Sequence, residues 1–268
     1  MYKNKYQTMQ TVLFTSTIFG PIHSRRLGIS LGVNLMPNDG KICSFDCLYC
    51  EAGYNAQGPG TTGVAKRETL KKQLKAKLQA MHEAGETLDV ITFSGNGEPT
   101  LHPEFKEIVH DVINLRNHYF PEAKVSVLSN ATMAGKPSVI AALKQVDNNI
   151  LKLDSAVAHT MRLINRPTSV NVQPQGIIED LKAYGGKCIV QTMMVRGEHD
   201  GEIVDNTTDA EIDALINAYL AIKPREIMLY TIDRKTPEEK LVKVPLDDLK
   251  RIARHIENET GITVQVSG

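Results

Sequence analysis

The stretch of sequence that decides the fold is Cys43-Ser44-Phe45-Asp46-Cys47-Leu48-Tyr49-Cys50, whose three cysteines have the spacing C-x3-C-x2-C. Thiolates are soft ligands that suit zinc or iron–sulfur clusters. A structural zinc ion takes four ligands, whereas this loop offers three, and neither His23 nor Cys188 stands at the usual spacing for a fourth. Three thiolates around a four-iron cube leave one iron without a protein ligand, so a substrate or cofactor can bind there.

Alternating apolar and amphipathic runs around the cysteines predict an α/β protein. Strands are expected at residues 29–35, 90–94, 124–129, 150–154, 187–195, 226–231 and 262–266. Helices are expected at residues 68–83, 103–117, 137–144, 175–184, 209–222 and 246–259. This alternation is typical of βαβ units and a parallel sheet. Six such units are too few to close an eight-stranded barrel, so we expect an open partial barrel or a doubly wound sheet, with ligands at the carboxyl ends of the strands.

The composition is that of an ordinary globular protein without a strong electrostatic field. The 268 residues are 41% hydrophobic and 23% charged, and 31 Lys and Arg balance 31 Asp and Glu. This balance weakens the case for nucleic acid or anionic lipid as a partner. We expect one domain over residues 1–268, with a lead-in at 1–28 and the barrel-like sheet at 29–268.

The N-terminus and the cysteines predict a cytoplasmic protein. Residues 1–10 are polar, and no signal peptide or membrane-spanning segment is recognised in the sequence. Cysteines that are close in sequence cannot form disulfide bonds that close long loops, and in a cytosolic chain such clusters are typical of metal ligands. Cys188 is isolated in an apolar run, so we expect it to be buried as a small hydrophobic residue.

Small and polar residues follow the second and third expected strands. The second strand runs into Gly95-Asn96-Gly97-Glu98-Pro99, where glycine would let the backbone come close to a ligand. A plain turn before a helix is the alternative interpretation. The third strand ends in Ser129-Asn130, a pair that is as common in ordinary turns as in ligand sites.

The fourth expected strand places a lysine and an aspartate on one face. Side chains alternate along a strand, so Lys152 and Asp154 face one way and Leu151 and Leu153 the other. Burying such a pair is costly unless the charges are paired or used, and a purely structural ion pair is the alternative. Later strands end in further substrate-pocket candidates, namely Gln191, Thr192, Tyr230, Asp233 and Arg234, whereas Met193 and Met194 are expected in the core.

The cysteine spacing, with Tyr49 before the last cysteine, resembles the signature of the radical S-adenosylmethionine superfamily. The resemblance implies a partial (β/α)6 TIM-like barrel, one [4Fe–4S] cluster on Cys43, Cys47 and Cys50, and S-adenosylmethionine bound to the open iron. An electron from the cluster splits a C–S bond, and the resulting 5′-deoxyadenosyl radical abstracts a hydrogen from substrate. An oxygen-sensitive, oxidoreductase-like enzyme that takes electrons from flavodoxin or ferredoxin is therefore expected.

The resemblance also implies roles for the polar residues. Gly95-Asn96-Gly97-Glu98-Pro99 is similar to the family's glycine-rich turn, with Asn96 where many members have glycine. Its backbone would approach the methionine moiety, and Glu98 would accept a hydrogen bond from the amino group. The other implied cofactor contacts are Tyr49 near the adenine, Ser129 and Asn130 near the ribose or carboxylate, and Asp154. The catalytic candidates are Lys152, Asp154 and Tyr230.

Four segments resemble a branch of small radical S-adenosylmethionine proteins related to wybutosine biosynthesis enzymes. They are Gly20-Pro21-Ile22-His23-Ser24-Arg25-Arg26-Leu27-Gly28, Cys43-Ser44-Phe45-Asp46-Cys47, Leu163-Ile164-Asn165-Arg166-Pro167 and Tyr230-Thr231-Ile232-Asp233-Arg234. The chain lacks spare cysteines, so a second cluster is not expected. Arg25 and Arg26 are interpreted either as a grip for phosphate or carboxylate or as a solvated basic pair, and His23 as structural. Whether desolvation prepares Lys152 for a Schiff base is left open.

Two hypotheses follow from these patterns. The first is a radical enzyme whose substrate is a small molecule, a peptide or a tRNA. The second is a zinc- or iron–sulfur-binding regulatory module that contacts RNA or a partner protein without catalysis. Neutral net charge and the lack of basic stripes disfavour the RNA form of the second hypothesis, and the glycine–glutamate turn favours the first.

Overall fold

A parallel sheet forms the frame of the molecule. The computed structural model describes residues 12–24 and 27–268. Its parallel strands are hydrogen-bonded in chain order: β2 Gly28–Val33, β3 Val90–Phe93, β4 Lys124–Ser129, β5 Asn148–Lys152, β6 Ile189–His199, β8 Glu226–Thr231 and β10 Val264–Ser267. β1 Ile18–Ser24 pairs antiparallel with β2. The order runs from β1 at one edge to β10 at the other, which confirms an open partial barrel.

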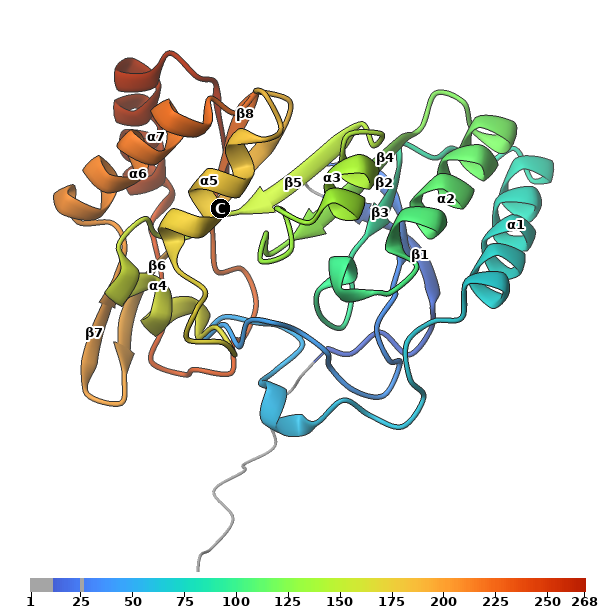
Figure 1. Ribbon diagram of the computed structural model, residues 1–268, viewed down its shortest axis with the longest axis horizontal. Coiled ribbons are helices and arrows are strands. Elements are labelled where there is room, and N and C mark those ends of the chain that lie inside the picture. The colour runs from blue at the N-terminus through green and yellow to red at the C-terminus, as the bar shows by residue number, and fades with distance from the viewer. Residues whose placement is uncertain (1–11, 25–26) are drawn as a thin grey trace, which may run out of the picture.

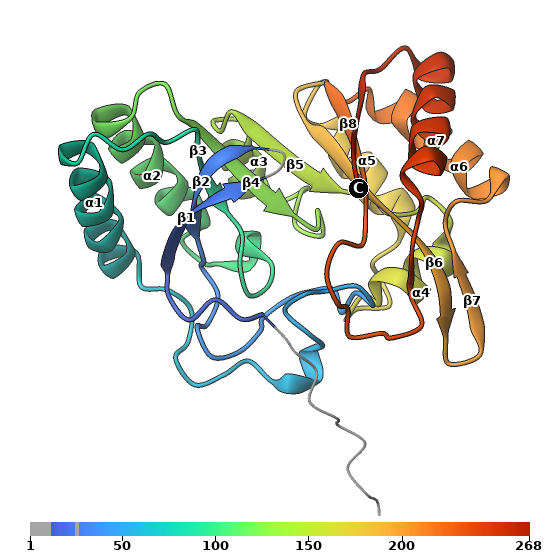
Figure 2. The ribbon, with the colours of Figure 1, turned by 180° about the vertical axis from the view of Figure 1, so that it is seen from behind.

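Helices follow the strands and cover the outer face of the sheet. They are α1 Arg67–Glu83, α2 Phe105–Tyr119, α3 Pro137–Leu143, α4 Ala158–Asn165, α5 Pro174–Lys182, α6 Asp209–Ile222 and α7 Leu246–Thr260. Figure 1 and Figure 2 show α1, α2 and α3 along one half of the curved sheet and α5, α6 and α7 along the other. The long connection after β2, which carries the three cysteines, crosses between the two halves at the carboxyl ends of the strands.

The two faces of the sheet bury different layers. The main core lies between the sheet and the helices and includes Leu151, which is fully buried. A second, small apolar cluster consists of Ile150, Ile189 and Met228 on the inner face. The alternation of side chains along β5 therefore sends Leu151 to the helices and Ile150 to the barrel interior.

Most predicted elements are confirmed, but short ones were not predicted. The expected strands at 124–129 and 226–231 match β4 and β8 residue for residue. β1, α4, β7 Glu202–Asp205 and β9 Val242–Lys243 have no counterpart among the predictions. α4 is eight residues long and β9 two, too short to establish a period. None of the described helices has the length and apolar character needed to cross a bilayer.

Candidate active site

The cysteine loop, residues 43–50, brings nitrogen donors to its sulfurs. Asn130, just beyond β4, donates from Nδ2 to the Sγ of Cys43 at 3.5 Å. Asn165, at the end of α4, donates from Nδ2 to the Sγ of Cys47 at the same distance. Because N–H groups stabilise negative charge on sulfur, the two contacts suit thiolates that hold a cluster.

The electrostatics of the loop also suit a metal-bound state. Burial raises the pKa of the Cys43 thiol to about 12 and that of the Cys47 thiol to about 11. The ammonium of Lys41 lies beside all three cysteines, is 3% exposed, and donates to the backbone oxygen of Gly53 at 2.7 Å. A buried thiol loses its proton when a metal binds, and a fixed cation stabilises the thiolate so formed.

The donor set fits a cluster better than a single ion. Among residues 12–24 and 27–268, no group of three or more His, Cys, Asp or Glu side chains is arranged around one metal ion. A structural zinc ion needs four ligands around one point. An iron–sulfur cube instead binds each thiolate to a different iron, so three thiols in one loop, with N–H donors and an ammonium beside them, fit it.

Residues 164–168, which we call the brace, hold the cysteine loop from outside. Four backbone hydrogen bonds join the two segments. The N–H of Asp46 donates to the oxygens of Asn165 and Arg166 at 2.9 Å and 3.2 Å, Leu48 N donates to Ile164 O at 3.0 Å, and Thr168 N donates to Ser44 O at 2.9 Å. Arg166 adopts a left-handed conformation, with φ of 46°, where α4 ends. The brace thus pairs loop N–H and C=O groups that would otherwise lack partners when buried.

The turn after β3 needs its glycines for contact with the protein itself. Gly97 has φ of +142°, and a Cβ there would lie 1.8 Å from the backbone oxygen of Ile42. A Cβ on Gly95 would lie 2.4 Å from Oδ1 of Asn34. The Cβ side of each glycine thus meets the segment leading into the cysteine loop, and the predicted ligand contact would have to use another side of the turn, where Gly95 lines a cavity.

Asn96 of the same turn is committed to the protein. Its side chain is buried and donates from Nδ2 to the backbone oxygens of Phe14 and Pro37, at 2.9 Å and 2.8 Å. Its backbone oxygen accepts from the N–H of Ile42 at 3.1 Å. Of the predicted cofactor-binding residues, Asn96 therefore faces structural partners, and Pro99 begins a short 3-10 helix, Pro99–Leu101.

Glu98 is a fixed, buried carboxylate. Its Oε1 accepts from the N–H and hydroxyl of Thr100 and from the Ser129 hydroxyl at 2.8 Å, and its Oε2 accepts from the N–H of Asn130 at 2.6 Å. Burial raises its pKa above the ordinary value, even though these hydrogen bonds act in the opposite direction. A carboxylate has about four acceptor positions on its two oxygens, so Oε2 can accept from one more donor. Glu98, Ser129 and Asn130 are thus brought together as the sequence predicted.

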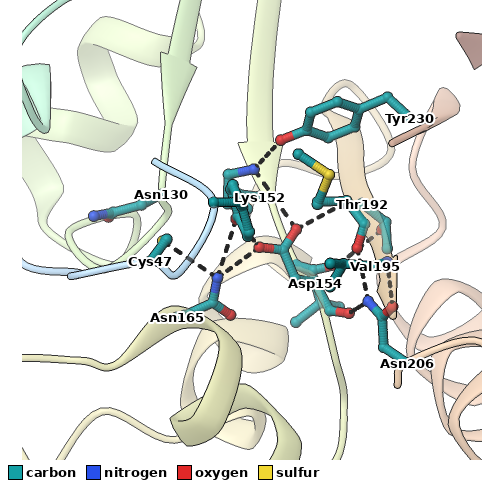
Figure 3. A network of polar contacts seen from close by, with 12 residues as sticks. Cys47, Asn130, Lys152, Asp154, Asn165, Thr192, Val195, Asn206 and Tyr230 are labelled. Atoms are coloured by element: carbon teal, nitrogen blue, oxygen red, sulfur yellow. Dashed lines mark hydrogen bonds and ion pairs between the residues drawn. The ribbon is translucent and has the colours of Figure 1, made fainter. Parts of the chain in front are cut away.

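Lys152, Asp154 and Tyr230 also meet, in a network that reaches the cysteine loop (Figure 3). Lys152 Nζ lies 3.6 Å from Asp154 Oδ1 and donates to the Tyr230 hydroxyl. Asp154 Oδ2 accepts from the Tyr49 hydroxyl and, at 2.6 Å, from Asn165 Nδ2. The predicted catalytic candidates and Tyr49 therefore share one hydrogen-bonded network with Cys47, a predicted cluster ligand.

Neighbouring groups in this network shift the pKa values of Lys152 and Tyr49. Burial acts to lower the pKa of Lys152, but Asp154 and Tyr230 outweigh it and leave the pKa raised. Burial, followed by the charge of Asp154, raises the pKa of Tyr49 well above its usual value. Lys152 is therefore a charged ammonium, which is the opposite of the desolvated, low-pKa amine that a Schiff base requires.

A cavity of about 350 Å³ lies inside the barrel next to the loop. Cys50, Gly95 and Arg234 line it, and so does His23, for which the sequence predicts a structural role. Arg234 forms an ion pair with Glu51 at 2.6 Å. Arg25 and Arg26, for which the sequence suggests two alternative roles, lie outside the residues that the structure describes.

The strand alternation separates the other pocket candidates. Gln191 pairs in register with Lys152 and is buried. Thr192 does not join it, because its hydroxyl lies on the helix side of β6, 2.6 Å from the Tyr219 hydroxyl of α6. Met193 and Met194 are buried, as predicted, and Cys188 is fully buried.

Sequence reasoning missed three residues of the site. Asn165 stands in the segment Leu163–Pro167, which was quoted for its motif, and Lys41 stands two residues before Cys43. A signal therefore existed, but nothing in a linear pattern brings Asn165 to Cys47. Asn206 donates from Nδ2 to the backbone oxygens of Asp154 and Met193, both at 2.7 Å. No sequence signal marks Asn206, because its partners are main-chain atoms.

Known proteins share both the sequence and the fold. A family model described as Radical SAM superfamily matches residues 38–210. A UPF0026 protein of Helicobacter pylori is 31% identical over 239 residues, which cover 85% of this chain and 72% of that protein. A protein of Brachyspira hyodysenteriae called GTPase Obg is 26% identical over 257 residues. The match covers 95% of this chain but 35% of that protein, so the chain spans about a third of that relative's length.

Solved structures share the architecture at low sequence identity. Streptococcus suis SuiB bound to S-adenosylmethionine superposes with a TM-score of 0.61 at 16% identity, over 88% of this chain and 50% of that chain. A structure of TYW1 with a lysine–pyruvate adduct gives a TM-score of 0.58 at 13% identity, over 85% of this chain and 73% of that chain. At such identities the likeness concerns the fold.

Proposed function

Because this chain belongs to the Radical SAM superfamily, we propose that it is an enzyme that cleaves S-adenosylmethionine reductively on one [4Fe–4S] cluster. Cys43, Cys47 and Cys50 are the proposed ligands of that cluster. When bound, the cluster and S-adenosylmethionine together supply a 5′-deoxyadenosyl radical for hydrogen abstraction. A small molecule, a peptide and a tRNA are the candidate classes of substrate.

The observation that carries the proposal is the surroundings of the three thiols. Asn130 and Asn165 each donate an N–H to a cysteine sulfur, and the Lys41 ammonium is buried beside all three. These groups stabilise negative charge on the sulfurs. Once a metal has displaced the thiol protons, such an environment offsets the charge of the thiolates that hold the cluster.

The remaining site residues have proposed roles in binding and orientation. Glu98 keeps one acceptor position on Oε2, and it would orient the amino group of S-adenosylmethionine. Asn130 would stand between that ligand and Cys43. Lys152, Asp154 and Tyr230 would border the bound nucleoside and the substrate, with the Lys152 ammonium offsetting the charge of Asp154.

The test compares two alanine variants after anaerobic purification. Cys47→Ala removes a proposed ligand, so we expect it to lose the brown colour and bound iron. With dithionite and S-adenosylmethionine it should release no 5′-deoxyadenosine. Cys188→Ala, the matched control, changes a fully buried cysteine of the main core and should keep both properties.

Two results would reject this function. Normal cleavage by Cys47→Ala would show that the loop is not the cluster site. Stoichiometric zinc with no cleavage in the wild type would favour the regulatory module instead. Once cleavage is established, transfer of deuterium from labelled candidate substrates into 5′-deoxyadenosine identifies the substrate class.

A further inference from the structure

The cysteine loop separates two hollows. On its inner side lies the barrel cavity, which Cys50 and Glu51 line. On its outer side lies a cleft of about 390 Å³ whose lining includes Asp46, Arg162 and Val170. The proposed function assigns the inner hollow to the chemistry and leaves the outer cleft without a role.

The outer cleft is close to the cluster ligands. Its wall includes Arg166 and Thr168 of the brace. The neighbouring brace residue, Asn165, donates from Nδ2 to Cys47 Sγ at 3.5 Å, and brace and loop are joined by backbone hydrogen bonds. One layer of residues therefore connects the surface of the cleft with a ligand sulfur.

The surface of this cleft is cationic at its rim and apolar at one point. Arg162 is exposed and donates to Gln173 Oε1 at 3.0 Å. Val170 is 85% exposed, the largest exposed fraction among the described large hydrophobic residues outside the core. Arginine and a few apolar side chains are the residues that protein interfaces favour.

The acidic residue in the cleft does not cancel these cations. Asp46 is largely buried, with 15% of its side chain exposed, and it faces the Lys41 ammonium at 3.6 Å and Arg166 at 3.7 Å. Arg166 also stacks over the Tyr54 ring at 4.9 Å. Arg162 thus presents its charge to solvent, and Arg166 is held in place beside it.

We propose that this face is the docking surface for a small acidic protein that carries one electron at a time. The inference rests on the proposed function, because reductive cleavage consumes one electron per S-adenosylmethionine. The carrier is oxidised by one electron and the cluster is reduced by one, and no group is transferred in this step. Electron-transfer encounters use small interfaces, and opposite charges speed such encounters.

The position of the face argues against a substrate as its occupant. A substrate must reach the barrel cavity, which lies on the other side of the cysteine loop. A polyanion such as RNA could meet the same arginines, but it would bring no electron. The acidic carrier is therefore the occupant that uses both the charge of the face and its nearness to Cys47.

The experiment measures how fast the oxidised cluster is reduced by photoreduced flavodoxin in an anaerobic stopped-flow instrument. Arg162→Glu should lower the second-order rate constant several-fold at low salt, and added salt should shrink the difference by screening. Arg251→Glu on α7, which reverses the charge of another exposed arginine outside the cleft, should match the wild type. Val170→Asp should also slow the reaction.

Dithionite separates this proposal from the proposed function. Every variant should be reduced by dithionite at the wild-type rate and should then cleave S-adenosylmethionine. Equal flavodoxin rates for Arg162→Glu, Arg251→Glu and the wild type at low salt would overturn the docking proposal while leaving the enzyme assignment intact. Weakened binding of a labelled RNA to Arg162→Glu, with an unchanged flavodoxin rate, would overturn it in favour of RNA. Wild-type protein that dithionite cannot activate would instead remove the proposed function.

Discussion

The carboxamide nitrogen of Asn165 lies within hydrogen-bond distance of three acceptors. Besides Cys47 and Asp154, its Nδ2 lies 3.2 Å from the Tyr49 hydroxyl. An NH2 group has two hydrogens for these three acceptors, so the contact with sulfur is shared. The residue acts through others: it positions the cysteine loop against the carboxylate network.

Replacing Asn165 should therefore change the cluster and not only the stability. An N–H directed at a ligand sulfur stabilises the more negative, reduced cluster. Asn165→Ala should make the midpoint potential of the cluster more negative, as measured by a redox titration followed by electron paramagnetic resonance. Asn117→Ala, in the exposed last turn of α2, should leave it unchanged, and equal potentials in all three proteins would contradict this role.

Gly97 offers a second prediction at the residue scale. Its φ is unfavourable for any L side chain, and an added Cβ meets the Ile42 oxygen at 1.8 Å. Gly97→Ala should cost about 2 kcal/mol or more of unfolding free energy and reduce the iron bound per chain. Gly85→Ala also has a positive φ but open space around the new Cβ. Thermal unfolding and iron analysis should show the smaller effect for Gly85→Ala.

At the scale of elements, a buried carboxylate joins α1 to α2. Asp111 of α2 accepts from Arg67 Nε at 2.7 Å and faces Lys71 Nζ at 3.0 Å, both on α1. Burial acts to raise its pKa, but the hydrogen bond from Arg67 and the two positive charges prevail, so the pKa is lowered. The group therefore stabilises the fold above the unfolded-state pKa, and this contribution is lost as pH falls through the lower folded-state pKa.

Asp111→Asn should reveal that contribution. At pH 7 the variant should lose about 1.5–3 kcal/mol of unfolding free energy, the range for hydrogen bonds to charged groups. The difference from the wild type should shrink as the pH is lowered below about 4, because the wild-type carboxyl group then becomes protonated. Urea unfolding at both pH values measures it, and a difference that grows in acid would contradict a lowered pKa for Asp111.

The same scale explains how far the sequence could predict this structure. Long periodic segments such as 209–222 were predicted to the residue, because a full apolar face is repeated several times. The strand expected at 150–154 instead runs from Asn148 to Lys152, since pairing with β4 and β6 sets its ends. α4 and the brace were missed, although the motif at 163–167 was noted, because the brace gains its role from contact with residues more than a hundred positions earlier.

At the scale of the whole molecule, truncating a side chain should cost more unfolding free energy in the main core than on the inner face of the sheet. Leu229 is fully buried in the main core, whereas its neighbour Met228 lines the cavity. Leu229→Ala should cost about 2–5 kcal/mol, as large-to-small changes in close-packed cores do. Met228→Ala should cost clearly less, because a side chain that borders a cavity has fewer packing contacts to lose. Chemical unfolding of both variants tests this, and equal losses would show that the inner face is packed like the core.

The backbone pairing of the brace with the cysteine loop sets an order of events during synthesis. All three thiols leave the ribosome well before residues 164–168 do, and until then the loop lacks its outer wall. Earlier segments fold first as a chain is made, yet this loop must wait for a partner that lies more than a hundred residues after it. Delivery of iron and sulfide is therefore best matched to a chain that has been made beyond residue 168, and any scaffold that loads the cluster meets a half already assembled around β2 to β5.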